Sequence, residues 1–201
     1  MAQDFIRAHG EEQKAVRVDQ IVEAALALYD EVGYDRLTFS KLAQGLGFSR
    51  INLYNYFRTK EELFLEIVRR AYDELVGDML SELPGEPMDA ERFSRAWCAV
   101  MARHPRAVEL FVLMNMQVLR AVDDVRQGEF QAYLDSMVTA LAERVALVRG
   151  LAPDEAWTLV AHLLNYAMGL WPIIARQSGY TPEAERAFLQ RYAEFVALLL
   201  R

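Results

Sequence analysis

The stretch FSRINLYNYFRTKEEL, residues 48–63, combines aromatic rings and positive charges at one short site. Its rings and cations are Tyr54, Tyr56, Phe57, Arg50, Arg58 and Lys60. A helix built only for burial has no use for two phenol hydroxyls beside three cations, because each polar group would have to be desolvated. The stretch therefore indicates a surface site, and the rest of the chain must show what that site meets.

Length and composition predict a globular protein with one large domain or two small ones. The 201 residues are 53% hydrophobic and 25% charged, which is typical of folded rather than disordered chains. We expect no membrane partner, because no apolar run approaches the roughly 18–20 residues that span a bilayer. The N-terminus, MAQDFIRAHGEEQKAV, lacks the apolar core of a signal peptide, so we expect a cytoplasmic location.

The cysteine and histidine content argues against a disulfide framework, a metal site or any other cofactor. Cys98 is the only cysteine, and His9, His104 and His162 lie far apart in the sequence. An enzyme that uses Cys98 or His104 is one alternative. The sequence offers no nucleophile, base and orienting group together, and Cys98 beside Trp97 is typical of a buried core thiol. We therefore expect a protein that is not an enzyme.

The net charge of −7 is unevenly distributed along the chain. Residues 1–60 contain eight basic and eight acidic side chains, whereas residues 61–201 carry the whole negative excess. Residues 36–60 contain five cations and no acid. Attraction to phosphate is local, because salt screens charges over about 8–10 Å, so a basic segment on an acidic protein is consistent with DNA binding. A solvated segment that merely lacks acids is the alternative.

Apolar periodicity is helical along nearly the whole chain, which predicts an all-α fold with about nine helices. The expected helices cover about 17–32, 38–46, 50–57, 60–83, 88–103, 105–122, 126–149, 153–178 and 181–200. Residues 1–16 have no clear apolar stripe and are expected to form a flexible arm.

Two short helices separated by a turn at Gly47 match the helix-turn-helix pattern. Ser49 is the expected N-cap of the second of them, and Thr59 begins the helix that follows. Leu53 and Phe57, four positions apart, should anchor this second helix to the core. Its eight expected residues span about 12 Å, which suits a DNA major groove about 12 Å wide.

Residues 21–68 strongly resemble the DNA-binding domain of the TetR family of transcriptional regulators. The diagnostic run is residues 48–63, where a small polar cap precedes a recognition helix that ends in Leu-Tyr-Asn-Tyr-Phe and is followed by Lys-Glu. The resemblance implies a three-helix DNA-binding domain over residues 17–62. It also implies an all-helical effector-binding and dimerisation domain over residues 63–201, where the likeness is one of architecture.

The resemblance also implies roles for individual residues at the DNA. Phosphate contacts are expected from Thr38, Tyr54, Tyr56 and Lys60, and base contacts from Arg50, Ile51, Asn52 and Asn55. Arginine can bond guanine, asparagine can bond adenine, and an apolar side chain can pack on a thymine methyl. Ile51 departs from the family, which usually has a small residue there. Arg36 and Arg58 are further phosphate candidates on charge grounds alone.

Large, soft side chains in the C-terminal part predict either ordinary core packing or an apolar effector pocket. The pocket candidates are Trp97, Met101, Phe111, Met114, Met137, His162, Asn165, Tyr166, Met168 and Trp171. His162 also fits a hydrogen-bonded structural histidine. Gly169 could instead let two helices approach closely, which would place His162 and Asn165 at a subunit interface. Pro172 predicts a kink in its helix.

The resemblance implies that the last two helices form a four-helix interface with a second copy of the chain. The interface candidates are Gly169, Phe188, Tyr192, Phe195 and Leu199. We therefore predict a homodimeric, ligand-responsive transcriptional regulator, a repressor that a largely apolar small molecule releases from a palindromic double-stranded operator. The alternative is a helical small-molecule-binding protein without DNA function.

Overall fold

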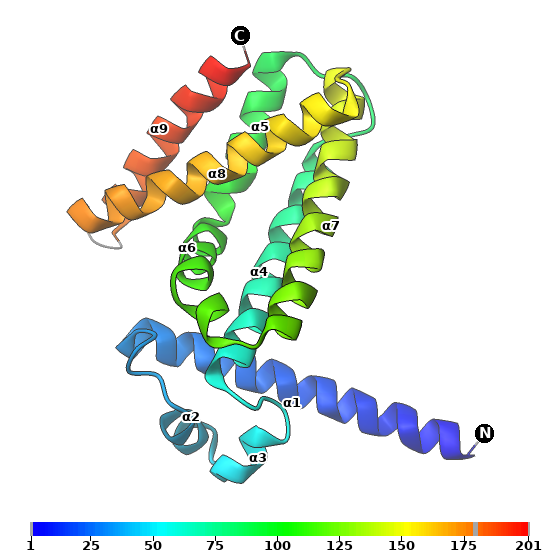
Figure 1. The fold of residues 1–201 in the computed structure, drawn as a ribbon, viewed down its shortest axis with the longest axis vertical. Helices are drawn as coiled ribbons and strands as arrows, with labels where there is room; N and C mark the ends of the chain where they lie inside the picture. The colour runs from blue at the N-terminus through cyan, green and yellow to red at the C-terminus, as the bar shows by residue number, and fades with distance from the viewer. Residues whose placement is uncertain (1, 179–180, 201) are drawn as a thin grey trace. The chain divides into compact units, whose positions relative to one another are not determined.

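The computed structural model describes the backbone of residues 2–178 and 181–200, and the side chains of residues 13–175 and 181–200. This described part contains α-helices and no strand, which confirms the predicted all-α fold (Figure 1). The helices are α1 (Ala2–Val32), α2 (Phe39–Leu46), α3 (Arg50–Tyr54), α4 (Lys60–Glu82), α5 (Ala90–Arg103), α6 (Pro105–Leu113), α7 (Asp124–Arg149), α8 (Pro153–Ser178) and α9 (Pro182–Leu199). The chain divides into two compact units, Met1–Ile67 and Val68–Arg201, and α4 contributes residues to both.

Local capping chemistry defines the helices of the first unit. Thr38 caps α2 by accepting a hydrogen bond from the Lys41 amide at 3.3 Å. Gly47 ends α2 in the left-handed region, at φ 65°, where a side chain would be strained. Ser49 then caps α3 by accepting from the Asn52 amide at 3.2 Å. The predicted cap at Ser49 and the predicted turn at Gly47 are therefore confirmed.

Helix α3 is shorter than the eight residues that the sequence suggested, since it covers only Arg50–Tyr54. The amides of Tyr56 and Phe57 still donate to Leu53 O, and the Arg58 N–H instead donates to the Glu62 carboxylate of α4 at 2.8 Å. Thr59 Oγ1 accepts from the Glu62 amide at 3.1 Å, so this Thr–Glu pair begins α4 as predicted.

Helix α1 begins at Ala2, whereas the sequence predicted a flexible arm over residues 1–16. The segment is rich in Ala, Glu, Gln, Lys and Arg and contains no proline, so its backbone favours a helix. The absence of an apolar stripe indicates that this segment has no buried face. It does not show that the segment is not helical. Exposed side chains from Gln13 to Arg17 agree with that reading.

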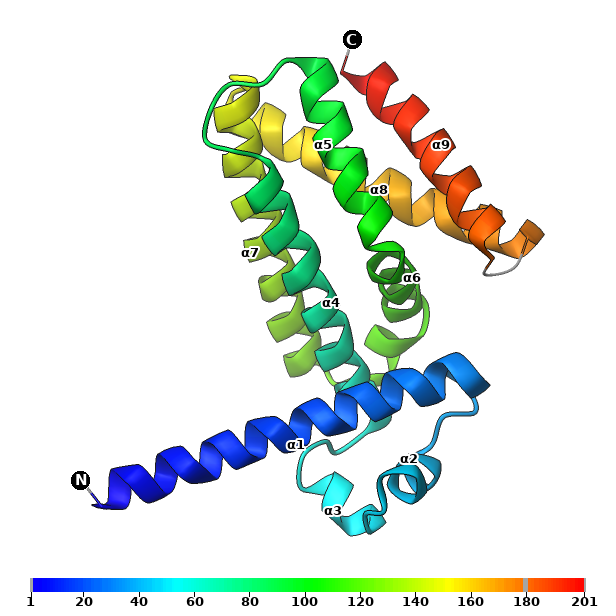
Figure 2. The same ribbon diagram turned by 180° about the vertical axis from the view of Figure 1, so that it is seen from behind.

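The second unit is a bundle in which α4 and α7 lie side by side (Figures 1 and 2). They run in the same direction, because Tyr133 Oη donates to Arg69 O at 2.9 Å and Arg144 Nη1 donates to Leu80 O at 2.6 Å. Arg144 also donates to Leu83 O, which supplies partners to carbonyls at the end of α4. These bonds fix the register of α4 against α7.

Side chains at the C-terminal end of α5, and His104 directly after it, contact α4. His104 Nε2 lies 3.0 Å from Asp78 Oδ2, and Arg103 reaches both Asp78 at 3.4 Å and Glu82 at 3.1 Å. The hydrogen bond from His104, and then that from Arg103, holds the pKa of Asp78 below its ordinary value of 3.8. The predicted helix end at His104 is confirmed.

The single helix expected over residues 105–122 is wrong in its second half. After α6 the chain forms a π-helical turn, η1 (Met114–Val118), and a 3₁₀ turn, η2 (Leu119–Ala121). Gln127 holds the end of this segment by donating to the carbonyls of Leu119 at 2.5 Å and Val122 at 3.3 Å. The sequence could not show this, because the competing partner lies in the next helix.

Helix α8 continues through Pro172 as far as Ser178. Its stretch Pro153–Ala175 is long and apolar enough to cross a membrane by length and composition. This corrects the expectation that no run approaches that length. A single such helix carries little weight, because core helices of globular proteins meet the same test.

Candidate nucleic-acid interface and ligand cavity

An open depression in the first unit gathers residues from α2, α3 and the start of α4. Thr38, Arg50, Tyr54, Arg58 and Lys60 line it, and we call these five the basic depression; the acid Asp35, in the loop before α2, also lines it. Three of the four expected phosphate contacts lie here, at positions that are up to 22 residues apart in sequence. Capping of α2 and α3 brings them together, because each cap fixes where the next helix starts.

Tyr54 is held by both α2 and α3. Its ring packs on Phe39 with centroids 5.3 Å apart, and its hydroxyl accepts from Arg50 Nη2 at 2.7 Å and from Nε at 3.2 Å. Tyr54 remains 42% exposed. Arg50 has five N–H groups, so this contact leaves donors on its guanidinium for a further acceptor.

The expected base-reading residues lie on the outer face of α3. Arg50, Asn52 and Asn55 are exposed, and Ile51 is 75% exposed. Leu53 on the opposite face is buried, as the sequence predicted. A five-residue helix anchored by one leucine therefore presents amide, guanidinium and apolar groups outward together, which are the group types that read base edges.

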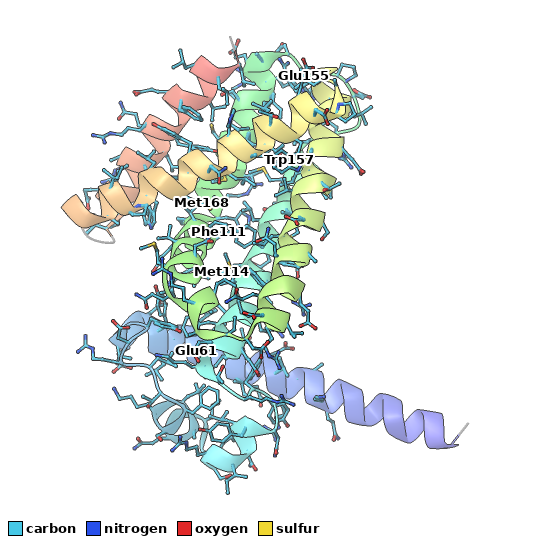
Figure 3. All side chains as sticks on the ribbon, in the orientation of Figure 1. Glu61, Phe111, Met114, Glu155, Trp157 and Met168 are labelled. Carbon is cyan, nitrogen blue, oxygen red and sulfur yellow. The ribbon has the colours of Figure 1, made fainter. Side chains whose placement is uncertain are left out.

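Lys60 is positioned by a residue that the sequence analysis missed, Tyr34. Lys60 Nζ donates to the Tyr34 carbonyl at 3.2 Å and lies 4.1 Å from its ring centroid. The Tyr34 hydroxyl donates to Glu61 at 3.1 Å. Glu61 lies at the start of α4 (Figure 3). Burial, and then the Glu61 carboxylate, raises the pKa of Tyr34 well above its ordinary value. One feature of the sequence could have identified Tyr34: it is an aromatic residue directly after Gly33, where the first helix ends.

The remaining expected contacts are Arg36, Arg58 and Tyr56, of which only Arg58 lines the basic depression. Arg36, Lys41 and Arg58 are exposed, and Arg36 Nε donates to Val32 O at 3.0 Å. Tyr56 is half-buried and does not line the depression. The arrangement offers cations and hydroxyls to a row of phosphates, which is a sequence-independent form of recognition.

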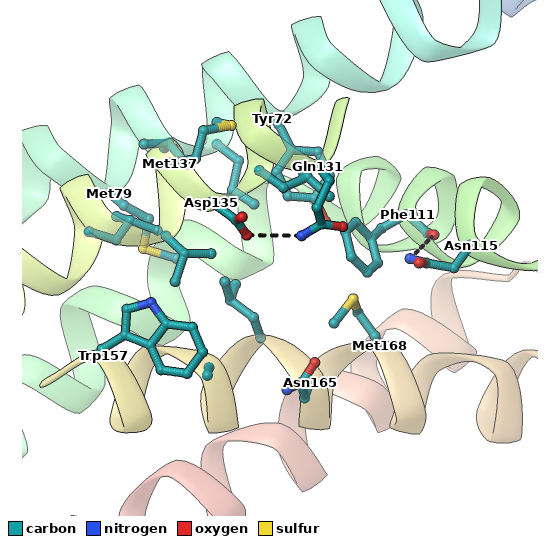
Figure 4. A pocket seen from close by; sticks show the side chains of 17 residues that line it. Tyr72, Met79, Phe111, Asn115, Gln131, Asp135, Met137, Trp157, Asn165 and Met168 are labelled. Atoms are coloured by element: carbon teal, nitrogen blue, oxygen red, sulfur yellow. Dashed lines mark hydrogen bonds between the residues drawn. The ribbon is translucent and has the colours of Figure 1, made fainter. Parts of the chain in front are cut away.

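The second unit contains a cavity of about 260 Å³ between α4, α6, α7 and α8 (Figure 4). Four expected pocket residues line it: Phe111, Met137, Asn165 and Met168. Its walls are mostly aliphatic, methionine and aromatic side chains, as is usual for small-molecule sites.

Six expected pocket residues do not line this cavity: Trp97, Met101, Met114, His162, Tyr166 and Trp171. The first three and Trp171 are buried in the core of the unit. His162 is exposed and lies in a separate shallow depression with Thr158 and Leu199. Tyr166 stacks on Phe195, with ring centroids 3.7 Å apart. A stripe on one helix cannot tell which neighbouring helix each side chain faces.

The sequence analysis also missed the wall that α4 contributes. Four residues of α4 line the cavity: Tyr72, Leu75, Val76 and Met79. Their helical spacing in the sequence could have predicted that they share one face of the helix. Gln131 and Asp135 on α7, Asn115 on η1 and Trp157 on α8 complete its polar and aromatic groups. Asn115 Nδ2 donates to Phe111 O at 3.0 Å.

Two expected dimer residues are buried inside the chain, so their assignment to an interface is wrong. Tyr192 accepts from Trp97 Nε1 at 2.8 Å and donates to Leu163 O at 3.0 Å. Phe188 packs edge-on against Trp171, with centroids 5.5 Å apart. The apolar stripe of α9 faces its own bundle because α5 and α8 supply these partners.

The other three expected dimer residues remain accessible. Gly169 is exposed and open space surrounds its Cα, Phe195 is half-buried, and Leu199 is 36% exposed. An accessible face of α8 therefore carries His162, Asn165 and Gly169 together.

Cys98 has none of the features of an activated nucleophile. Burial raises the pKa of its thiol, against a smaller opposing effect of a hydrogen bond to Ser94. Across the described residues, no group of three or more His, Cys, Asp and Glu side chains is placed to hold a metal ion.

Comparison with known proteins gives matches along most of the chain. The family described as "Bacterial regulatory proteins, tetR family" matches residues 21–67, and "Tetracyclin repressor-like, C-terminal domain" matches residues 69–184. The HTH-type transcriptional repressor Rv1474c of Mycobacterium tuberculosis is 28% identical over 160 residues, covering 68% of this chain and 86% of that protein. The HTH-type transcriptional regulator RutR of Escherichia coli is 23% identical over 195 residues, covering 92% and 85%.

Solved structures share the fold. A TetR-family regulator from Mesorhizobium loti aligns with a TM-score of 0.67 at 21% identity, covering 93% of this chain and 96% of that one. FadR from Bacillus subtilis, solved in complex with stearoyl-CoA, aligns with a TM-score of 0.59 at 16% identity, covering 89% and 96%.

Proposed function

Because this chain belongs to the TetR family of bacterial transcriptional regulators, we propose that it represses transcription as a homodimer on a palindromic operator and is released by a small-molecule effector. It is a DNA-binding, ligand-responsive regulator, and its relatives are regulators rather than enzymes. A protein that acts on DNA in bacteria works in the cytoplasm, which is the location we propose.

The observation that carries the proposal is one chain with two kinds of site. The first unit presents three cations, Arg50, Arg58 and Lys60, at one depression beside an outward polar helix face. The second unit contains a partly open, mostly apolar cavity of about 260 Å³. A ligand-binding protein without DNA function would have no use for the first, and a constitutive DNA-binding protein would have no use for the second.

In the proposed complex, α3 enters the major groove and the basic depression holds the backbone. Thr38, Tyr54, Tyr56 and Lys60 would contact phosphates, and Arg50, Ile51, Asn52 and Asn55 would meet base edges. Ile51 would pack on a thymine methyl, since it is too exposed to serve the core. A homodimer would present two such helices about one DNA turn apart, roughly 34–36 Å.

Helix α4 is the proposed connection between effector and DNA. It begins at Lys60, beside the basic depression, and its later turns carry Tyr72, Val76 and Met79 on the cavity wall. An effector that prefers one position of α4 would change the separation of the two recognition helices. Shifting the two states from 1:99 to 99:1 requires about 5.5 kcal/mol of preference, while a coupling of about 1–3 kcal/mol would only tune repression.

The dimer contact is proposed for the accessible faces of α8 and α9. Gly169, Phe195 and Leu199 remain from the expected interface set, and Ile173 and Leu198 are large apolar side chains that are at least half exposed nearby in sequence. Burying such side chains in a symmetric contact would stabilise the dimer by about 25 cal/mol per Å² of apolar surface.

Selection of bound duplexes from a randomised DNA pool tests the proposal. A two-fold symmetric winning sequence that binds two chains would support it, because operator symmetry mirrors protein symmetry. A pool without enrichment, or a winner bound by a single chain, would contradict the proposed mode of action.

A further inference from the structure

The cavity walls carry a single charged side chain. Among the described residues that line the cavity, Asp135 is the only acid, and there is no lysine, arginine or histidine. The neutral polar groups are Tyr72, Asn115, Gln131 and Asn165. A ligand in this cavity therefore meets negative charge at one point and no positive charge anywhere on the wall.

The carboxylate of Asp135 is oriented by its own helix. Gln131, one turn earlier on α7, donates from Nε2 to Asp135 Oδ1 at 2.9 Å (Figure 4). That bond uses one of the two N–H donors of the Gln131 amide and leaves its carbonyl oxygen, together with Asp135 Oδ2, as acceptors. Both groups accept hydrogen bonds, so this part of the wall favours a ligand that donates several.

Aromatic rings of the cavity add a second attraction for positive charge. Trp157 on α8 lies across the cavity from Asp135, and it is 50% exposed (Figure 4). Phe111 and Tyr72 pack together on another wall, with centroids 5.3 Å apart. The face of an aromatic ring attracts a cation within about 6 Å, and tryptophan does so most strongly.

We propose that the effector carries a protonated amine on an apolar body, and that Asp135 and Gln131 bind the ammonium group while the remaining wall buries the apolar part. This inference rests on the proposed function of the cavity as the effector site. A carboxylate or phosphate head group would meet Asp135 without any counter-charge on the wall, so fatty acids and acyl phosphates are disfavoured.

Three probes with one tail separate these possibilities: octylamine, octanol and octanoate. Each is titrated into the full-length protein at pH 7 and 150 mM salt, with isothermal titration calorimetry and tryptophan fluorescence as readouts. Trp157 is the reporter, because the other two tryptophans, Trp97 and Trp171, are buried outside the cavity wall. A Trp157→Phe variant identifies the part of the signal that comes from the cavity.

We expect octylamine to bind about tenfold more tightly than octanoate, with octanol between them, since Asp135 is exposed to solvent and its attraction is correspondingly reduced. Asp135→Asn keeps the size of the side chain and removes its charge, and should reduce that ratio to about twofold or less. Glu129→Gln is the matched control, because it removes one exposed acid from the same helix outside the cavity wall. The ratio should be unchanged in this control.

Two results would overturn the inference alone: octanoate binding as tightly as octylamine, or an amine preference that survives Asp135→Asn. In both cases the cavity would still bind an octyl probe and the proposed function would stand. If none of the three probes bound, the inference and the proposed role of the cavity would both fall.

Discussion

Replacing Tyr192 by phenylalanine should destabilise the protein by about 2 kcal/mol, although only one oxygen atom is lost. The Tyr192 hydroxyl is fully buried and joins three helices, accepting from Trp97 on α5 and donating to the Leu163 carbonyl on α8. In the variant, the buried Trp97 Nε1–H has no acceptor, and a buried donor without a partner costs about 1–3 kcal/mol. The Leu163 carbonyl loses less, because a helical carbonyl also accepts from the amide four residues later.

Urea unfolding monitored by circular dichroism, at one fixed protein concentration, measures this difference. The control is Tyr166→Phe, which removes the same atom from a half-buried ring that stacks on Phe195. We expect the control to change the unfolding free energy by less than about 0.5 kcal/mol. Equal values for the two variants would refute the argument that the hydroxyl of Tyr192, and not merely its ring, is built into the core.

Three further predictions concern the turn, the α4–α5 contact and the DNA-binding face. Gly47→Ala should lower the unfolding free energy by about 1 kcal/mol, because Gly47 has a positive φ. Gly45→Ala inside α2, where the added methyl meets open space, should raise the unfolding free energy by about 0.5–1 kcal/mol. The melting temperatures of the two variants should therefore shift in opposite directions, and shifts of the same sign would contradict this prediction. The lowered pKa of Asp78 means that its carboxylate stabilises the folded chain above about pH 4, and that this contribution is lost as pH falls through the lowered pKa. Asp78→Asn should therefore lose less stability than the wild type between pH 6 and pH 3 in urea titrations, and parallel losses would be inconsistent with the contact. Lys60→Ala should weaken binding to operator and random DNA alike, because Lys60 is proposed to contact a phosphate. Asn52→Ala should weaken binding to the operator by about 1–3 kcal/mol more than binding to random DNA, as measured by fluorescence anisotropy. If both variants weakened binding to the two DNAs equally, the division between phosphate and base contacts would be wrong.

Local chemistry made the first unit predictable from the sequence. Thr38, Ser49 and Thr59 each accept a hydrogen bond from an amide three residues later, and Gly47 adopts the conformation that only glycine adopts easily. These interactions depend on residues within one helical turn, so their partners are visible in the sequence. Tyr34 escaped notice because its partners are 26 and 27 residues away.

The second unit was predicted correctly as helices and less well as a site. An apolar stripe says that a helix has a buried face, but it does not name the helix that covers it. Tyr192 and Phe188 therefore looked like interface residues and are core residues, since α5 and α8 already cover them. Four predicted pocket residues, Phe111, Met137, Asn165 and Met168, line the cavity, whereas its wall on α4 was missed, because no helix reveals in sequence which other helices converge on it.

The most direct test of the account is the salt dependence of binding to a selected duplex. If Arg36, Lys41, Arg58 and Lys60 each neutralise one phosphate in both protomers of a dimer, log K should fall with log salt with a slope of roughly −7. Fluorescence anisotropy between 50 and 300 mM salt measures that slope, and Arg58→Gln should make it shallower by about 2, one for each protomer. A slope near zero, or one that Arg58→Gln leaves unchanged, would contradict the claim that this surface holds a DNA backbone.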